Sequence, residues 1–228
     1  MNKTKKIVSI SLSIIFYLTA LFLIFIIIKN DLSYISTSRG VKFVLLILSS
    51  AAIYAGTFFL CLTQNKKTKN KIKKFMIWLF FVQYLYLLIT LGFFDKRSAG
   101  NIFLLNSGEL RAYITKRVNL TPFKEIIKYL TSFSHPGKSF YMFWGYFVGN
   151  IITFTPFALF LPRLLKVNTF LKFFIIMVLI VVCVEAIQFI TMSGYADVDD
   201  VILNVSGSAA AYWVLNKTRL KNYINKFF

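Results

Sequence analysis

The chain contains six long runs of hydrophobic residues separated by shorter polar segments. The runs are 7–28, 43–63, 75–94, 139–161, 173–190 and 201–215. A helix needs about 20 apolar residues to cross the hydrocarbon core of a bilayer. Glu185 interrupts the fifth run, and the sixth is short unless Val198 extends it. The pattern therefore predicts an all-α polytopic membrane bundle of about six transmembrane helices.

The segment between the third and fourth runs has the pattern of an amphipathic helix. Thr121 can cap such a helix, and Pro122 suits its first position. Apolar residues then recur at helical spacing, at Phe123, Ile126, Ile127, Leu130 and Phe133. Lys124 and Lys128 fall on the other face. We expect this helix to lie in the outer membrane interface and not to cross the bilayer.

These elements divide the chain into four regions. We predict an N-terminal three-helix membrane region at 1–94, followed by an extracytoplasmic loop with the interfacial helix at 95–138. The three remaining helices form a core at 139–216, and a basic cytoplasmic tail follows at 217–228.

The composition agrees with a membrane protein and excludes several other classes. Hydrophobic residues make up 57% of the 228 residues and charged residues 15%, whereas a soluble domain has about 25% charged residues. This balance excludes a soluble enzyme, a disordered chain and a disulfide scaffold. The single histidine, His135, excludes a multi-histidine metal cluster.

The distribution of charge predicts the orientation. The N-terminus, the loop 64–74, the fourth-to-fifth connection and the tail contain lysine and arginine but no acidic residue, whereas seven of the eight acidic residues lie in the alternate segments. The positive-inside rule places the basic set in the cytoplasm. With six spans, both termini of this multi-pass membrane protein are expected to be cytoplasmic. Since topology explains the basic residues, we expect no nucleic-acid partner.

Several polar residues fall where a membrane helix should be apolar. Ionisable groups in the membrane are costly and usually face a cavity or a partner. Glu185 and Gln188 share one face of the fifth helix, and three carboxylates follow it closely. The residues predicted to line a polar pocket at the outer leaflet are Arg117, Asn119, Asn150, Glu185, Gln188, Asp197, Asp199, Asp200 and Asn204. Arg111, Lys116 and Arg117 could supply counter-charges, and crowding of the carboxylates should raise some of their pKa values.

The sixth helix has one face of small and polar residues. Asp200, Asn204, Gly207, Ser208 and Ala211 recur at helical spacing. This face can border a polar cleft or allow a neighbouring helix to approach closely. On the fourth helix, Asn150 taken alone suggests an interhelical hydrogen bond. Pro156 leaves the carbonyl of Ile152 in need of another donor.

Three motifs resemble the VanZ-like family of small bacterial membrane proteins. The segment RVNLTPF at 117–123 is similar to the family's R-x-N-L-x-P-F segment, and NIITFTPF at 150–157 is similar to its N-x-x-x-F-x-P-F segment. The most specific match joins EAIQ at 185–188 to DVDDVILN at 197–204, with Gly207 beyond it. The resemblance covers roughly residues 110–216. It departs from the family at Gly194, where many members have an arginine.

The resemblance implies reduced sensitivity to teicoplanin and related lipoglycopeptides. Our leading hypothesis is a non-enzymatic protein of the cell envelope with no cofactor. Its partners would be membrane lipids and, at the carboxylate-lined pocket, a lipoglycopeptide or a lipid-linked envelope intermediate.

Three alternatives remain open from the sequence. The first is an enzyme acting on a lipid-linked substrate, with Asp197, Asp199 and Asp200 as ligands of Mg²⁺ or Mn²⁺ and Glu185 as general base. The second is a proton-coupled transporter with Glu185 as the proton carrier. The third is a purely structural role, in which the polar residues hold the bundle together.

Overall fold

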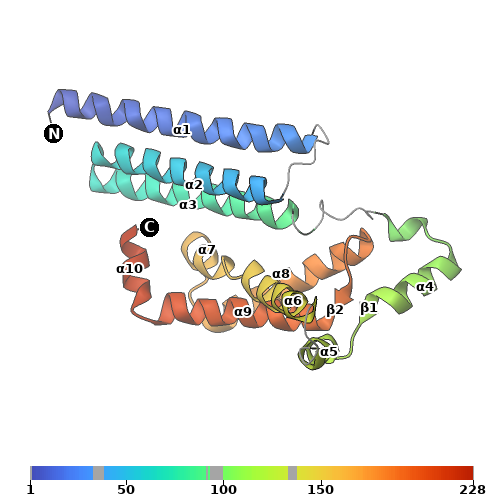
Figure 1. Ribbon diagram of the computed structural model, residues 1–228. Helices are drawn as coiled ribbons and strands as arrows, with labels where there is room; N and C mark the ends of the chain where they lie inside the picture. Colours follow the sequence, from blue (N-terminus) through green and yellow to red (C-terminus); the bar gives the residue numbers. More distant parts are fainter. Residues whose placement is uncertain (1, 33–38, 91, 93–99, 133–137, 228) are drawn as a thin grey trace. The chain divides into compact units, whose positions relative to one another are not determined.

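The computed structural model of the chain describes residues 2–32, 39–90, 92, 100–132 and 138–227 (Figure 1). The N-terminal elements are α1 Lys3–Leu32, α2 Arg39–Leu62, α3 Lys66–Ile89, η2 Ile102–Leu104, α4 Ser107–Arg117 and β1 Val118–Asn119. The later elements are α5 Lys124–Ser132, α6 Lys138–Thr153, α7 Phe157–Leu164, α8 Phe170–Ile190, β2 Ala196–Asp197, α9 Val198–Lys217 and α10 Leu220–Phe227. The predicted all-α fold class is confirmed.

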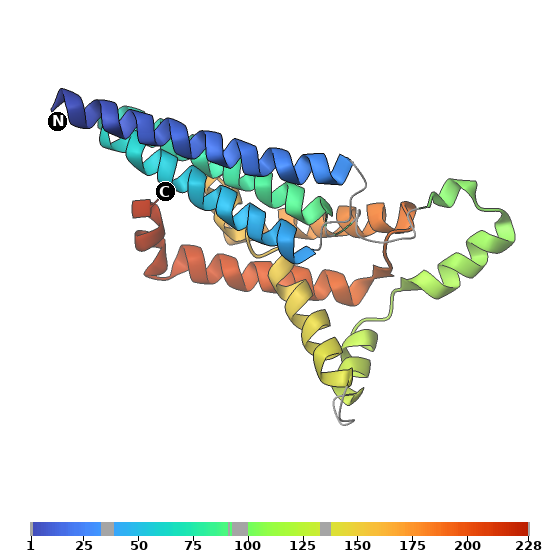
Figure 2. The ribbon, with the colours of Figure 1, turned by 45° about the horizontal axis from the view of Figure 1, so that its top comes forward.

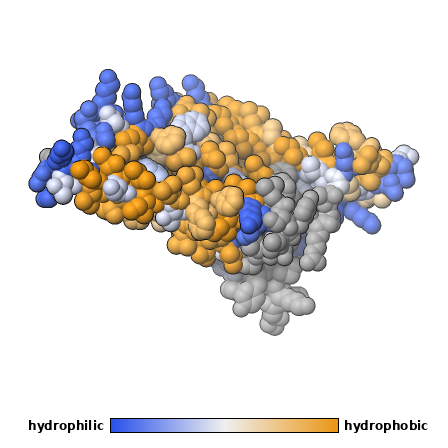
Figure 3. All heavy atoms as spheres, turned by 90° about the horizontal axis from the view of Figure 1, so that it is seen from above, coloured by the Kyte–Doolittle hydropathy of each residue, from blue (hydrophilic) through white to orange (hydrophobic). Residues whose placement is uncertain are grey.

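Five stretches within the described residues are long and apolar enough to cross a membrane. They are Lys3–Asp31, Gly40–Leu62, Lys66–Ile89, Trp144–Leu164 and Phe170–Ile190. Large apolar side chains on these helices face outward, for example Phe22 at 63% exposure and Leu179 at 59%. Figure 3 shows hydrophobic residues over much of the visible face. Lipid tails would cover such a surface, as expected for a helical membrane bundle.

The sixth predicted span, α9, forms but is not among these five stretches. Its 20 residues would extend about 30 Å. Its hydropathy is lower because acidic and polar side chains occupy its first turns, and several of them are buried by neighbouring helices. Length thus permits a sixth crossing, while composition alone does not identify it.

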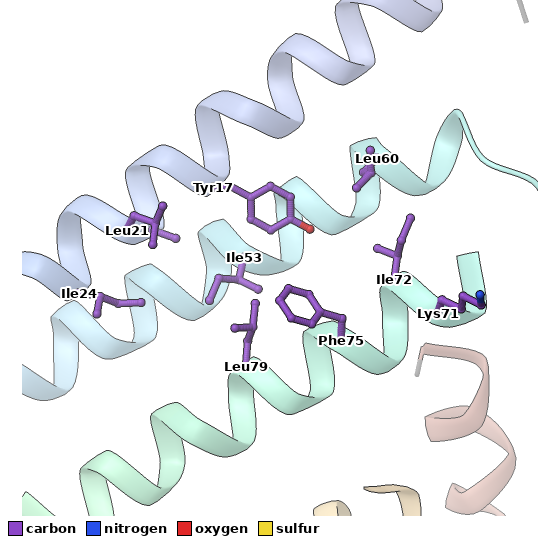
Figure 4. A pocket seen from close by; sticks show the side chains of 10 residues that line it. Tyr17, Leu21, Ile24, Ile53, Leu60, Lys71, Ile72, Phe75 and Leu79 are labelled. Carbon is purple, nitrogen blue, oxygen red and sulfur yellow. The ribbon is translucent and has the colours of Figure 1, made fainter. Parts of the chain in front are cut away.

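The chain forms two compact units, residues 1–83 and 84–227. In the first unit, α1 and α2 pack side by side along their length (Figures 1 and 2). Ala20, Ala52, Ile53 and Met76 form its buried core. A largely apolar hollow of about 520 Å³ lies between α1, α2 and α3, and Figure 4 shows the side chains that line it.

Helix α3 begins earlier than predicted. The sequence pattern placed Lys66 to Lys74 in a loop, but α3 starts at Lys66. The Asn65 side chain accepts a hydrogen bond from the Thr68 backbone at 2.9 Å, which caps the helix, and lysine is a good helix former. The predicted end of this run at Phe94 lies outside the described residues.

The second unit is organised around α9. Helices α5, α6, α7, α8 and α10 all pack against it. The two short strands β1 and β2 pair in parallel, with Val118 opposite Ala196 and Asn119 opposite Asp197. This pairing joins the segment before α5 to the start of α9, although nearly 80 residues separate them.

The fourth hydrophobic run is not one helix, as the pattern predicted, but two. Helix α6 ends at Thr153 and α7 begins at Phe157. Pro156 lacks the backbone N–H needed to continue the α6 ladder. The orphaned carbonyl of Ile152 instead accepts the backbone N–H of Thr155 at 3.1 Å and its hydroxyl at 2.7 Å. The expected need for another donor is met within the same turn.

Candidate functional site

The start of α9 is a meeting point of hydrogen-bonded polar side chains. We call this group the polar junction, and it comprises Asn119, Asn150, Asp197, Asp199, Asp200 and Asn204. These residues come from β1, α6, β2 and α9. The motifs at 117–123, 150–157 and 197–204, which are far apart in the chain, therefore lie close together here.

Asp197 connects the two strands to the helix that follows. As the N-cap of α9, its Oδ1 accepts the backbone N–H of Asp199 at 2.9 Å. The same oxygen accepts the Asn119 side-chain amide, also at 2.9 Å. Burial raises the pKa of Asp197, with a smaller contribution in the same direction from the charge of Asp199. The expected rise is therefore present at this carboxyl, but burial and not crowding is its main cause.

Asp199 is completely buried and caps a helix distant in sequence. Its Oδ1 accepts the backbone N–H of Phe123 at 2.5 Å. Its Oδ2 accepts those of Glu125 at 2.8 Å and Ile126 at 3.2 Å. A carboxylate at this position satisfies amides that α5 leaves without intrahelical partners and complements the positive end of its dipole.

The predicted start of α5 is therefore wrong in its details. The helix begins at Lys124, and the observed cap is the Asp199 carboxylate, whereas Thr121 and Pro122 were predicted to start it. Phe123 has φ of 64°, so the chain turns through a left-handed residue just before the helix. The predicted helix otherwise exists, and Phe133 lies outside the described residues.

Asp200 and Asn150 link α9 to α6. The Asn150 amide donates to Asp200 Oδ1 at 2.7 Å, which is the interhelical hydrogen bond expected for this asparagine. Tyr146, one turn earlier on α6, stacks on Tyr129 of α5, with the ring centroids 4.5 Å apart. The sequence alone does not single out these two tyrosines, because aromatic residues are common in membrane helices.

Asn204 contributes a polar atom that the described residues do not satisfy. Its amide donates to the Asp200 backbone carbonyl at 2.8 Å. Its Oδ1 is buried and accepts no hydrogen bond from any described residue. A buried acceptor of this kind is costly and calls for a donor such as water or a ligand.

Gly207 brings α6 and α9 into close contact below the polar junction. A Cβ added to Gly207 would lie 2.1 Å from the backbone oxygen of Ile151. Gly145 and Gly149, the GxxxG pair of α6, have nothing within 4 Å of such a Cβ. Of the two roles proposed for the small-residue face of α9, close helix approach is the one observed at Gly207.

Glu185 and Gln188 lie on α8, before the turn into β2. The Gln188 amide donates to the carbonyl of Gly92 at 3.2 Å, and its backbone carbonyl accepts Ser193 at 2.9 Å. Gln188 thus stabilises the turn and is not hydrogen-bonded to the polar junction. Glu185 is partly buried, with its Oε2 shielded from solvent.

Arg117 does not provide the counter-charge that the sequence suggested. Its guanidinium lies over the Tyr195 ring at 4.2 Å and 6.0 Å from the Tyr113 ring. Within the described residues, no ion pair joins Arg111, Lys116 or Arg117 to an aspartate of the polar junction. The negative charge of Asp199 is instead stabilised by backbone N–H groups, which do not appear in a count of charged residues.

The geometry does not bring the three aspartates together as metal ligands. Asp197 faces Asn119, Asp199 faces the start of α5, and Asp200 faces Asn150. In the part of the chain that the structure describes, no three His, Cys, Asp or Glu residues are grouped to hold a metal ion. The three-aspartate site predicted for the enzyme alternative is therefore not formed by this arrangement.

Helix α4 was not predicted. Asn106 and Glu109 form a reciprocal capping box, with hydrogen bonds of 2.9 and 3.0 Å. The spacing of these two residues is a recognised start signal, so this helix could have been found from the sequence.

Comparison with known families agrees with this convergence of motifs. A family model described as VanZ/LLP1 matches residues 80–220, which include the whole polar junction. Neither the comparison with curated proteins nor that with solved structures gives a match. Since the family model covers more than half of the chain, the protein belongs to the VanZ/LLP1 family and is a membrane protein of the VanZ type.

Proposed function

We propose that this protein lowers the sensitivity of a bacterial cell to teicoplanin and related lipoglycopeptides, and that it does so without enzymatic activity. The polar junction and the adjacent α5 would form the binding surface at the outer leaflet. The ligand would be an amphiphile with a polar body and an acyl tail, either the antibiotic itself or a lipid-linked envelope intermediate.

The observation that supports this proposal best is the anchoring of α5 by Asp199. Because the buried carboxylate binds three backbone amides, it holds the start of α5 beside the polar junction. Two apolar side chains of α5 are exposed within the part of the chain that the structure describes, Ile127 at 56% and Leu130 at 51%. An apolar helix face and a polar group thus lie next to each other, as an amphiphile requires.

Within the polar junction, we assign different roles to the aspartates. Asp197 and Asp199 hold the junction together, since their oxygens bind groups of the protein itself. Asp200 and Asn204 are the better candidates for ligand contact, because Asn204 offers a buried acceptor that no described residue satisfies. Glu185, on the neighbouring α8, would contribute to the same surface.

The orientation belongs to the same proposal. The basic segments are cytoplasmic, α9 is the sixth span, and both termini lie in the cytoplasm. The polar junction then faces the outer leaflet, where a lipoglycopeptide acts. Of the alternatives, the metal-dependent enzyme gains no support from the three aspartates, since each binds a different group of the protein.

The proposal is tested by expressing the full chain in a sensitive bacterial host. Susceptibility is measured to teicoplanin and to a glycopeptide of the same class that lacks an acyl chain. We expect protection against the lipidated compound and little against the other, because the exposed face of α5 recognises the tail. Equal protection against both would contradict a role for the tail, and no protection would overturn the proposed function.

A further inference from the structure

A second polar pocket lies at the opposite end of α9 from the polar junction. We call it the basic pocket, and it is lined by Arg163, Asn168, Tyr212, Asn216, Lys217 and Lys221. Its volume is about 240 Å³, enough for about eight water molecules at their volume in the liquid. The lining comes from α7, α9, α10 and the α7–α8 connection, which lie together in Figure 1.

Hydrogen bonds and ring contacts fix the floor of this pocket. Arg163 donates to the carbonyl of Leu159 at 2.9 Å, which restrains the guanidinium. The Asn216 amide donates to the carbonyl of Ala158 at 3.0 Å and so ties α9 to α7. The Tyr212 ring, almost fully buried, stacks on Phe173 at 4.5 Å. These contacts hold Arg163, Asn216 and Tyr212 in place, so three of the side chains that line the pocket are fixed by the unit itself.

The charge of the lining is entirely positive. Three cationic side chains contribute to it, and no acidic residue does. Helix α8 starts just after Asn168, and its N-cap Thr169 makes no side-chain cap hydrogen bond. The positive end of that helix dipole therefore adds to the field near the pocket.

Helix-end stabilisation explains part of this charge but not all of it. Arg163 and Lys217 each lie in the last turn of their own helix, where a cation offsets the negative end of the dipole. Lys221 has no such role, since it lies at the start of α10, where a positive charge is unfavourable. The positive-inside rule accounts for a basic residue in this segment, but it does not require that residue to line the same pocket as the two other cations.

We propose that the basic pocket binds the phosphate of an anionic phospholipid headgroup. The surroundings favour a lipid over a soluble phosphate compound. Leu171, in the first turn of α8, is 67% exposed, and Trp213, next to Tyr212 in the sequence, is 61% exposed. Both side chains would contact the acyl chains of a lipid. On α10, exposed Leu220 and Tyr223 alternate with basic and amide residues, a pattern typical of a helix lying in the membrane interface.

This inference goes beyond the proposed function and does not depend on it. The two sites share no residue: along α9, Asn204 of the polar junction and Tyr212 of the basic pocket are eight residues apart, about 12 Å along the helix axis. A protein that failed to protect against any glycopeptide could still bind an anionic lipid here.

The test uses the purified full chain with phosphatidylglycerol as the anionic probe and phosphatidylcholine as the zwitterionic one. Binding is measured by native mass spectrometry and by the shift in melting temperature. Each basic residue near an anionic headgroup contributes about a fivefold gain in affinity. We therefore expect Lys221→Gln to weaken phosphatidylglycerol binding about fivefold, and Lys217→Gln/Lys221→Gln about 25-fold.

The matched control is Lys66→Gln/Lys67→Gln, which removes two exposed charges from the start of α3 in the other unit. We expect it to leave the binding unchanged. Equal weakening in control and pocket variants would overturn the proposal, as would no preference of the wild type for the anionic lipid. Displacement of the lipid by inorganic phosphate at equal concentration would also overturn it, by assigning the site to a soluble phosphate. If the double variant does not fold, Lys221→Gln alone decides the question, because Lys221 is exposed.

Discussion

The carboxylate of Asp199 accepts the backbone N–H of Phe123 at 2.5 Å, across a separation of 76 residues. This contact and the two beside it fix the beginning of α5 to the first turn of α9. The same aspartate, which looks from the sequence like one of three candidate ligands, is thus a helix cap supplied from another part of the chain.

Replacing this cap should weaken the second unit. We expect Asp199→Asn to lower the free energy of unfolding by about 2–4 kcal/mol, because hydrogen bonds to a charged acceptor are worth more than those to a neutral one. Thermal unfolding in detergent measures the effect. Asp200→Asn is the control, since an amide oxygen can still accept the bond from Asn150. Equal losses in the two variants would contradict the special role of Asp199.

Close packing at Gly207 predicts that substitution of this glycine destabilises the protein far more than substitution of Gly145 or Gly149. We expect Gly207→Ala to lower the free energy of unfolding by about 3 kcal/mol or more, since the added carbon would meet the backbone of Ile151 at 2.1 Å and α6 would have to shift. Gly145→Ala and Gly149→Ala should be neutral, or stabilising by up to about 1 kcal/mol, because both sites are open helix positions. A tolerated Gly207→Ala would show that the two helices are farther apart than described.

Burial of Asp197 predicts a dependence of stability on pH. Its pKa in the folded protein lies above the ordinary 3.8, so the folded state binds more protons than the unfolded state between these two values. The stabilisation from this group is complete below pH 3.8 and is lost as the pH rises through the folded pKa. Asp197→Asn should remove this decline when melting temperatures are compared across the acid range. Parallel profiles for wild type and variant would refute the assignment.

The predicted orientation can be checked with single cysteines. After Cys61 and Cys183 are replaced, an impermeant maleimide applied to intact cells should label Arg111→Cys on α4. It should not label Lys67→Cys at the start of α3 or Lys221→Cys on α10. All three positions are exposed in the structure. Labelling of Lys221→Cys but not of Lys67→Cys would mean that α9 is not a sixth span.

Much of the fold follows from features that act locally. The hydrophobic runs identify the helices, since each must bury its backbone bonds internally in a membrane. Pro156 also marks a break in the helix. How the chain accommodates the break depends on Thr155, whose hydroxyl donates to the carbonyl of Ile152 that lacks its helical partner. The sequence predicted that the carbonyl of Ile152 needs another donor, but it did not predict that α6 ends at Thr153. The start of α3 lies outside the third hydrophobic run, because the hydrophobic pattern cannot detect a lysine-rich first part of a helix.

The sequence motifs name several residues that lie close together at the start of α9, but they do not predict how these residues are arranged. The motif spacing selects Asn119, Asn150, Asp197, Asp199 and Asp200. Hydrogen bonds join Asn119 and Asp199 to Asp197, and a separate one joins Asn150 to Asp200. The motif spacing cannot show that Asp199 caps α5. Its partners there are backbone N–H groups, which every residue except proline has. Nor can the spacing separate Arg117, which stacks on Tyr195, from an ion-pair partner.

The most direct test of the account compares teicoplanin susceptibility in a sensitive host expressing wild type, Glu185→Gln, Asp200→Asn or the control Gly145→Ala, with membrane levels of each protein quantified. We predict that wild type and Gly145→Ala protect, while Asp200→Asn and Glu185→Gln at equal abundance do not. Full protection by both carboxylate variants would contradict a ligand site at the polar junction. Loss of protection only in proportion to loss of protein would show that these residues serve the fold alone.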